Sequence, residues 1–92
     1  MSLDSLAQRV NSIARLTGTF TLRSGQIASD YFDKYRFEAD PVLLADIAVA
    51  LAPLLPDATE VLVGLELGGV PIATALSLHT GLPVAFVRKE AK

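Results

Sequence analysis

A glycine-containing loop is one of two stretches whose residue types could bind an anion. The loop, Glu66-Leu67-Gly68-Gly69, follows the apolar run at residues 61–63 and precedes a helical pattern that opens at Pro71. A loop between a strand and a helix presents backbone N–H groups at the positive end of the helix dipole, which suits phosphate. A tight turn whose glycines only let the helix fold back on the strand explains the same pattern, and it is the more common of the two.

A basic cluster near the end of the sequence is the second such stretch. Arg88, Lys89 and Lys92 are three of the eight basic residues, and they lie within five positions. Cations grouped in this way can face a polyphosphate, because one close charge pair is worth about 4 kcal/mol at an effective dielectric near 20. Without a ligand, the same cluster is a solvated chain end.

An aromatic-rich segment and a polar turn form a third candidate region. Residues 31–37 (YFDKYRF) alternate as a strand does, and they can pair with residues 19–22 (TFTL) across the turn Arg23-Ser24-Gly25-Gln26. Aromatic residues are enriched in strands, so packing is the simpler role for three of them in seven positions. The single histidine, His79, is interpreted as a cap or a surface residue near the end of a helix.

Composition narrows the class of protein. The 92 residues are 51% hydrophobic and carry a net charge of −2, which predicts one small domain with a real core and argues against a nucleic-acid coat. No apolar run approaches the roughly 18 residues of a membrane span, so no membrane partner is expected. There is no cysteine. A reducing compartment is consistent with that, and we expect a cytoplasmic protein.

The apolar spacing predicts a helix, a ribbon, and then alternating helices and strands. Predicted helices cover residues 3–16, about 40–53 and about 71–80, and predicted strands cover 19–22, 31–37, 61–65 and 84–87. Asp40 followed by Pro41 marks a helix start, and Gly81 marks a helix end. The two later strands are apolar throughout, so we expect both of their faces to be buried.

The order strand, helix, strand in residues 61–87 predicts an α/β fold in which these two strands are parallel. Ligands of such sheets bind beyond the carboxyl ends of the strands. Those ends are Leu65-Glu66 and Arg88-Lys89. The glycine loop and the basic cluster, distant in sequence, should therefore meet at one edge of the sheet.

Four motifs together resemble one family. TFTLRSGQ, YFDKYRF, VGLELGGVPIA and FVRKEAK occur in this order over nearly the whole chain, and they are similar to orotate phosphoribosyltransferases. The resemblance implies transfer of ribose 5-phosphate from phosphoribosyl pyrophosphate (PRPP) to orotate with Mg²⁺, giving orotidine monophosphate and pyrophosphate in pyrimidine biosynthesis. It also implies the type I phosphoribosyltransferase fold, a mostly parallel sheet flanked by helices with a small hood from the N-terminal segment. The family works as a homodimer with shared active sites.

The resemblance assigns substrate-binding residues. Arg23 matches a basic position that reaches the base and PRPP, and Tyr31 and Phe32 match an aromatic pair that holds orotate. Leu67 and Gly68 match the pyrophosphate loop, where many members carry a lysine at the position of Gly68. With no lysine here, the loop should bind phosphate through backbone amides. The family often holds a strained non-proline cis peptide at this loop, so we expect a strained peptide at or beside Glu66-Leu67.

The resemblance also assigns catalytic residues in the basic cluster. Arg88, Lys89 and Lys92 match the start of the family's mobile catalytic loop and would both bind substrate and act in catalysis. Arg88 and Lys92 would act in the neighbouring subunit's site, and Lys89 in its own. No metal-ligating residue is assigned.

The sequence lacks the family's acidic PRPP-binding motif and the histidine after the basic run. We therefore expect residues 1–92 to be a single partial domain, inactive alone, with an N-terminal helix and hood ribbon in 1–38 and the first βαβ part of the core in 39–92. Two alternatives stay open: a purine or uracil phosphoribosyltransferase, and a non-catalytic α/β module that only binds phosphate.

Overall fold

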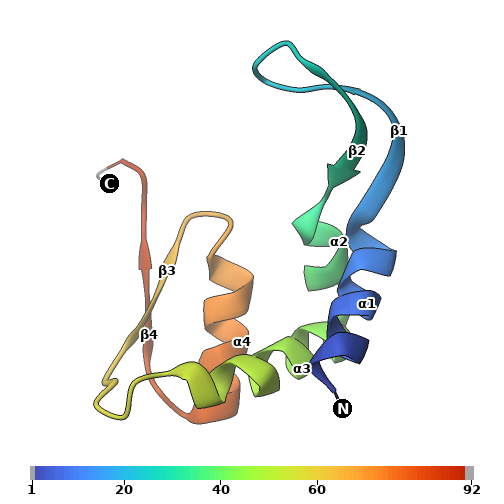
Figure 1. Ribbon diagram of the computed structural model, residues 1–92. Coiled ribbons are helices and arrows are strands. Elements are labelled where there is room, and N and C mark those ends of the chain that lie inside the picture. The colour runs from blue at the N-terminus through green and yellow to red at the C-terminus, as the bar shows by residue number, and fades with distance from the viewer. Residues whose placement is uncertain (1, 91–92) are drawn as a thin grey trace. The chain divides into compact units, whose positions relative to one another are not determined.

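The computed structural model describes residues 2–90 (Figure 1). Contacts divide the chain after Leu43 into two compact units. The first contains a helix, a two-stranded ribbon and a short helix, and the second contains a parallel strand pair with helices. Among the described residues, no helix is long and apolar enough to cross a membrane.

The first unit opens with helix α1, Leu3–Ala14. The Ser2 hydroxyl accepts a hydrogen bond from the N–H of Ser5 at 3.1 Å and caps the helix start. The helix ends two residues before the predicted end, because the chain becomes extended at Arg15. Leu6 and Ala14 are buried on its apolar face.

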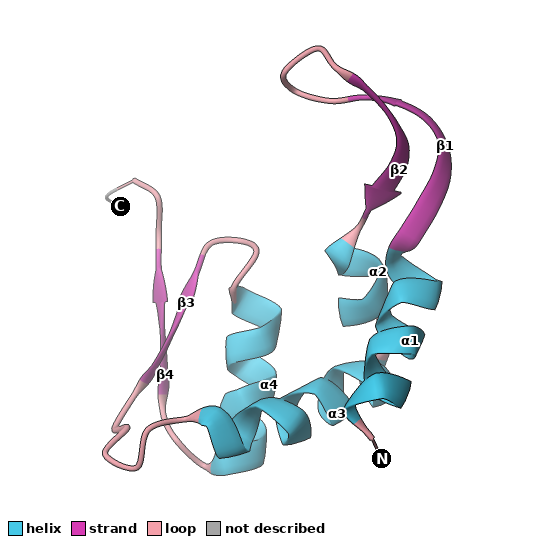
Figure 2. Cartoon of the chain, viewed as in Figure 1, coloured by secondary structure: helices cyan, strands magenta, loops and turns pink. Residues whose placement is uncertain are grey.

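Strands β1, Arg15–Thr21, and β2, Ile27–Phe32, form the predicted antiparallel ribbon (Figure 2). Both strands begin four residues earlier than predicted. Arg15 pairs with Phe32 at one end, and Thr21 pairs with Ile27 at the other end, beside the turn. Arg15 Nε also lies 3.2 Å from Asp30 Oδ1, and this hydrogen bond raises the pKa of Arg15.

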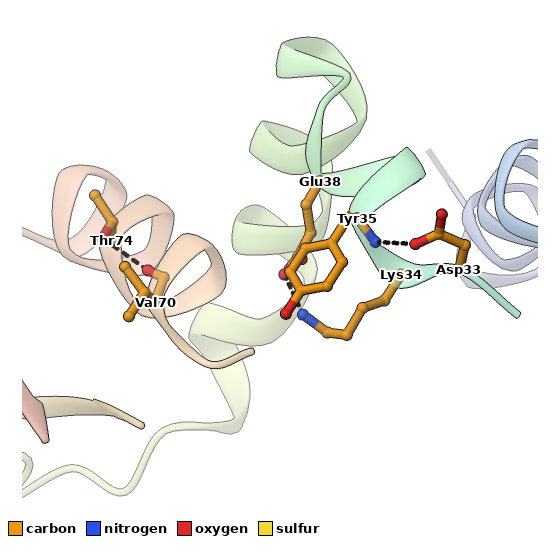
Figure 3. Close-up of polar contacts among 6 residues, drawn as sticks. All are labelled: Asp33, Lys34, Tyr35, Glu38, Val70 and Thr74. Atoms are coloured by element: carbon orange, nitrogen blue, oxygen red, sulfur yellow. Dashed lines mark hydrogen bonds and ion pairs between the residues drawn. The ribbon is translucent and has the colours of Figure 1, made fainter. Parts of the chain in front are cut away.

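The predicted strand at residues 31–37 is wrong beyond Asp33, because helix α2, Lys34–Glu38, replaces its second half. Figure 3 shows the reason: Asp33 Oδ1 accepts the N–H of Tyr35 at 3.2 Å, and Lys34 Nζ lies 2.6 Å from Glu38 Oε2 one turn later. An Asx cap and an i,i+4 ion pair favour a helix. The alternating aromatic residues concealed both signals. Phe37, at 9% exposure, is buried by the helix rather than by a strand.

Helix α3, Pro41–Leu51, crosses the boundary between the units and leads into a 3₁₀ turn, η1, Ala52–Leu54. Asp40 Oδ1 accepts the N–H groups of Val42 and Leu43 at 3.1 and 3.0 Å, so the predicted cap is confirmed. The helix ends close to Pro53, as its sequence predicted.

The second unit contains strand β3, Leu62–Leu65, helix α4, Val70–Thr80, and strand β4, Val84–Val87. The strands pair in parallel, with Leu62 opposite Val84 and Leu65 opposite Val87, as predicted. Gly81 ends α4 at φ 79°, a left-handed cap that suits glycine. His79 is exposed in the last turn of α4, as expected.

The core of the second unit lies between the strand pair and its helices. Ala48, Leu62 and Leu76 are buried at its centre. Partly buried apolar residues surround them: Leu51, Ala52, Leu55, Ile72, Ala75, Leu82 and Val84. Thr74 and Thr80 of α4 each donate a side-chain hydrogen bond at 2.7 Å to a carbonyl four residues earlier, as Figure 3 shows for Thr74 and Val70.

The expectation that β3 and β4 are buried on both faces is wrong. Burial alternates along β3, and Val63 and Leu65 are 54% and 62% exposed. Phe86 in β4 is 52% exposed. Helix α4 packs against one face of the pair, so apolar residues that point to the opposite face remain exposed.

Candidate functional site

The loop after β3 and the segment after β4 lie beside each other, as the parallel topology predicts. The N–H of Glu66 donates to the carbonyl of Val87 at 2.9 Å, and the N–H of Lys89 donates to Glu66 Oε1. A cavity of about 360 Å³ is lined by Leu65, Glu66, Val87, Arg88 and Lys89. The expected meeting of the loop and the basic cluster is therefore confirmed for Arg88 and Lys89. Lys92 lies outside the described residues.

The loop between β3 and α4 turns within four residues (Figure 2). The Glu66–Leu67 peptide is cis, as the family resemblance led us to expect. Gly69 N–H donates to Leu65 O at 2.8 Å and closes the turn. Gly69 is also the N-cap of α4 and supplies no side-chain acceptor. The loop therefore ends at a helix terminus of positive potential that no side chain of the cap neutralises.

The three glycines of this region have different physical roles. A Cβ on Gly64 would lie 2.9 Å from Gly69 O and 3.0 Å from Ala73 Cβ, and one on Gly69 would lie 2.9 Å from Leu65 N. A side chain at either position would approach the backbone too closely, so Gly64 and Gly69 let the start of α4 pack closely against β3. A Cβ on Gly68 would meet nothing within 4 Å. The plain-turn interpretation explains Gly64 and Gly69, but it gives no reason for a glycine at 68.

We expect Gly68→Lys to raise the affinity of the chain for inorganic pyrophosphate without loss of stability. Space is available for the side chain, and φ at Gly68 is not positive. The substitution adds a cation beside the helix terminus, so affinity should rise by about five- to ten-fold at low salt. Isothermal titration with pyrophosphate measures this, with Gly68→Gln as the uncharged control. Equal affinities for the two variants would contradict a phosphate site at this loop.

We call the edge where the loop at residues 66–69 meets Arg88 and Lys89 the rim. Positive charge at the rim comes from the segment after β4. Arg88 and Lys89 are exposed, and the loop has no basic residue between Glu66 and Gly69. Arg88 offers a planar fork of donors and Lys89 a compact ammonium group, and both suit phosphate oxygens. Within residues 2–90, no group of three His, Cys, Asp or Glu side chains could hold a metal ion.

The predicted substrate residues of the first unit lie on the ribbon. Arg23 is exposed in the turn, whereas Tyr31 and Phe32 lie at the far end of β2. The turn that holds Arg23 adjoins Ile27, the first residue of β2. Ile27 and Tyr31 are four residues apart, which is about 13 Å along the strand. The ribbon itself therefore does not bring Arg23 to the aromatic pair.

Tyr31 and Phe32 also differ from each other, because successive strand residues point to opposite faces. The Tyr31 ring lies 5.7 Å from that of Phe20, and the Phe32 ring lies 6.1 Å from that of buried Phe37. Phe32 thus has a packing role against α2. Both rings remain about half exposed, at 48% and 52%.

Glu66 is the rim residue to which the sequence assigned no role. Its backbone extends the hydrogen bonding of β3 to Val87, and its side chain reaches Lys89. An acidic residue directly after a buried strand, at the carboxyl edge of a parallel pair, is the signal that could have identified it.

Known proteins match the chain over its whole length. No protein-family model matches it. An orotate phosphoribosyltransferase from Nocardioides sp. is 60% identical over 93 residues, which cover 100% of this chain and 52% of that protein. The crystal structure of Mycobacterium tuberculosis orotate phosphoribosyltransferase with Fe(III) dicitrate superimposes with a TM-score of 0.81 at 35% identity, over 96% of this chain and 52% of that one. The same enzyme in complex with PRPP gives a TM-score of 0.75 at 31% identity, over 96% and 55%.

The chain spans about half the length of the curated relatives it matches. Sequence and fold agree over that span: the parallel β3–β4 pair with α4, and the ribbon that follows α1, belong to a type I phosphoribosyltransferase fold. This chain belongs to the orotate phosphoribosyltransferase family.

Proposed function

We propose that this chain supplies the pyrophosphate-binding part of an enzyme that transfers ribose 5-phosphate from PRPP to orotate in pyrimidine biosynthesis. The observation that carries the proposal is the rim, where the loop at residues 66–69 opens α4 beside Arg88 and Lys89. A relative of the same fold was solved with PRPP, which supports a site for that substrate. The products would be orotidine monophosphate and pyrophosphate.

The rim fits the leaving group of this reaction. The bond between ribose C1 and the pyrophosphate oxygen breaks as a bond to a ring nitrogen of orotate forms, so negative charge grows on pyrophosphate. Loop amides and the cations Arg88, Lys89 and Lys92 would stabilise that charge in the transition state. Following the family, Lys89 would act in its own site, and Arg88 and Lys92 in the site of a second subunit of a homodimer.

The ribbon would contribute to the other substrate. Arg23 would bind the orotate carboxylate and PRPP, because a guanidinium forms paired hydrogen bonds with carboxylates and phosphates. Tyr31 and Phe32 would hold the orotate ring, as the family resemblance implies, and both of their rings are about half exposed.

Mg²⁺ is part of the proposal but has no site of its own among the described side chains. In the described part of the chain, residues 2–90, no group of three His, Cys, Asp or Glu side chains could hold a metal ion. Mg²⁺ commonly binds through substrate phosphates and water, and it would reach this enzyme with PRPP. We also propose a cytoplasmic location, in keeping with a sequence without cysteine.

Selective binding of orotate tests the proposal. The protein for this test, called the extended protein, is residues 1–92 joined to the half of the Nocardioides relative that the chain does not span. Calorimetric titration with orotate, adenine, hypoxanthine and uracil should show binding of orotate alone. Binding of a purine or of uracil would favour another phosphoribosyltransferase, and binding of phosphate without any base would favour a non-catalytic module.

We expect Arg23→Ala to weaken orotate or PRPP binding by about ten- to a hundred-fold, the worth of a hydrogen bond to a charged group. The melting temperature should not change, because Arg23 is exposed in a turn. Titration and thermal unfolding of the extended protein measure both quantities. An equal loss of stability and binding would show that Arg23 has a structural role.

A further inference from the structure

We infer that Glu66 is a positioning residue that holds the basic segment at the rim by accepting the backbone N–H of Lys89. The inference rests on the proposed function for the ligand, pyrophosphate. The contact itself is a feature of the structure: Glu66 Oε1 accepts from the Lys89 N–H across the end of the strand pair.

Two hydrogen bonds from one residue fix the start of the basic segment. The Glu66 N–H donates to the carbonyl of Val87 at 2.9 Å, which is the last backbone bond from β3 toward β4. Strand β4 ends at Val87, so the following residues have no strand partner to guide them. The Glu66 side chain replaces that partner two residues later, at Lys89. Residues 87–89 are thereby held against the loop instead of leaving it.

This anchoring matters because Arg88 and Lys89 are exposed and their side chains are long. A cation on a mobile backbone must be ordered when the anion binds, and that ordering reduces affinity. With its backbone already held, Lys89 starts from a fixed position on the wall of the 360 Å³ cavity, which Glu66 also lines.

The Glu66 carboxylate has a second, opposing effect on an anion. Its negative charge lies at the mouth of a site for pyrophosphate and repels that ligand. Two substitutions distinguish the hydrogen bond to the Lys89 N–H from the repulsion of pyrophosphate. Glutamine keeps an Oε1 acceptor for the Lys89 N–H and removes the charge, whereas alanine removes both.

The test is a pair of variants, Glu66→Gln and Glu66→Ala, of the 92-residue chain labelled with ¹⁵N. We expect the Lys89 amide proton to keep its chemical shift and exchange protection in Glu66→Gln and to lose them in Glu66→Ala. In titrations with inorganic pyrophosphate, Glu66→Ala should bind about five- to ten-fold more weakly than the original chain, because removal of the repelling charge offsets part of the loss of the hydrogen bond. Glu66→Gln should bind at least as tightly as the original chain.

Two affinity results would overturn the inference: Glu66→Ala binding pyrophosphate as well as Glu66→Gln does, or both variants losing the same affinity. Lys89 protection that persists in Glu66→Ala would also overturn it, because the contact would then not depend on the carboxylate. Failure of the proposed function is distinguishable, since in that case the original chain shows the Lys89 contact but binds no pyrophosphate. If Glu66→Ala does not fold, loss of the Lys89 amide shift or of pyrophosphate affinity in Glu66→Gln, measured against the original chain, would overturn the inference.

Discussion

Residues 1–92 by themselves will form no detectable orotidine monophosphate from orotate, PRPP and Mg²⁺, whereas the extended protein will. Transfer of a cation-like ribose between two groups depends on fixing both ends of PRPP. On the proposed function, the residues from Glu66 to Gly69 and from Arg88 to Lys89 would bind only the pyrophosphate end. No two acidic residues are adjacent anywhere in the sequence, so it offers no acidic pair for the ribose hydroxyls.

The measurement is orotidine monophosphate formation by the two purified proteins at equal concentration. Positioning of this kind corresponds to an effective molarity of about 10⁵ M or more. The rates of the two proteins should therefore differ by at least about 10⁴-fold. The extended protein with Lys89→Ala is the control for a background activity in the added half. Comparable turnover from residues 1–92 would show that they bind the ribose phosphate by themselves.

Gly64→Ala will destabilise the second unit by about 1–3 kcal/mol, the usual cost of overpacking. The new Cβ would lie 2.9 Å from the backbone oxygen of Gly69 and 3.0 Å from Ala73 Cβ. A flexible side chain could move aside, but backbone at the first turn of α4 cannot move without disturbing the contact of that helix with β3. For a domain of this size, the melting temperature should fall by about 4–8 °C per kcal/mol.

Gly68→Ala is the matched control for Gly64→Ala, because it adds the same methyl group four residues away into open space. Its free energy of unfolding should stay within about 0.5 kcal/mol of the original. Urea unfolding followed by circular dichroism gives both values. If the two variants are equally stable, close packing of α4 on β3 is not the reason for Gly64.

The sequence predicted most of the elements because each has a strong local signal. Asp40 caps α3, Gly81 ends α4, and the turn at residues 23–26 closes the ribbon, as composition and spacing indicated. Parallel pairing of β3 and β4 followed from their separation by a helix, and the meeting of the loop with Arg88 and Lys89 followed from that pairing.

Three features were not predicted, and each has its own physical reason. Helix α2 forms where aromatic alternation indicated a strand, since the Asp33 cap and the Lys34–Glu38 pair outweigh it. The outer faces of β3 and β4 are exposed. This was not predicted, because an apolar strand sequence does not reveal which elements are present to cover the strand. The contact of Glu66 with Lys89 depends on the direction of a side chain, which hydrophobic patterns do not encode.

The open space around Gly68 has an evolutionary consequence. Gly64 and Gly69 leave no room for a side chain without a shift of backbone, so substitutions there are expected to impair folding. A mutation at position 68 meets no such penalty, yet this residue belongs to the loop that would bind pyrophosphate. Selection can therefore alter the charge of the site through this position in a single step, without a compensating substitution elsewhere.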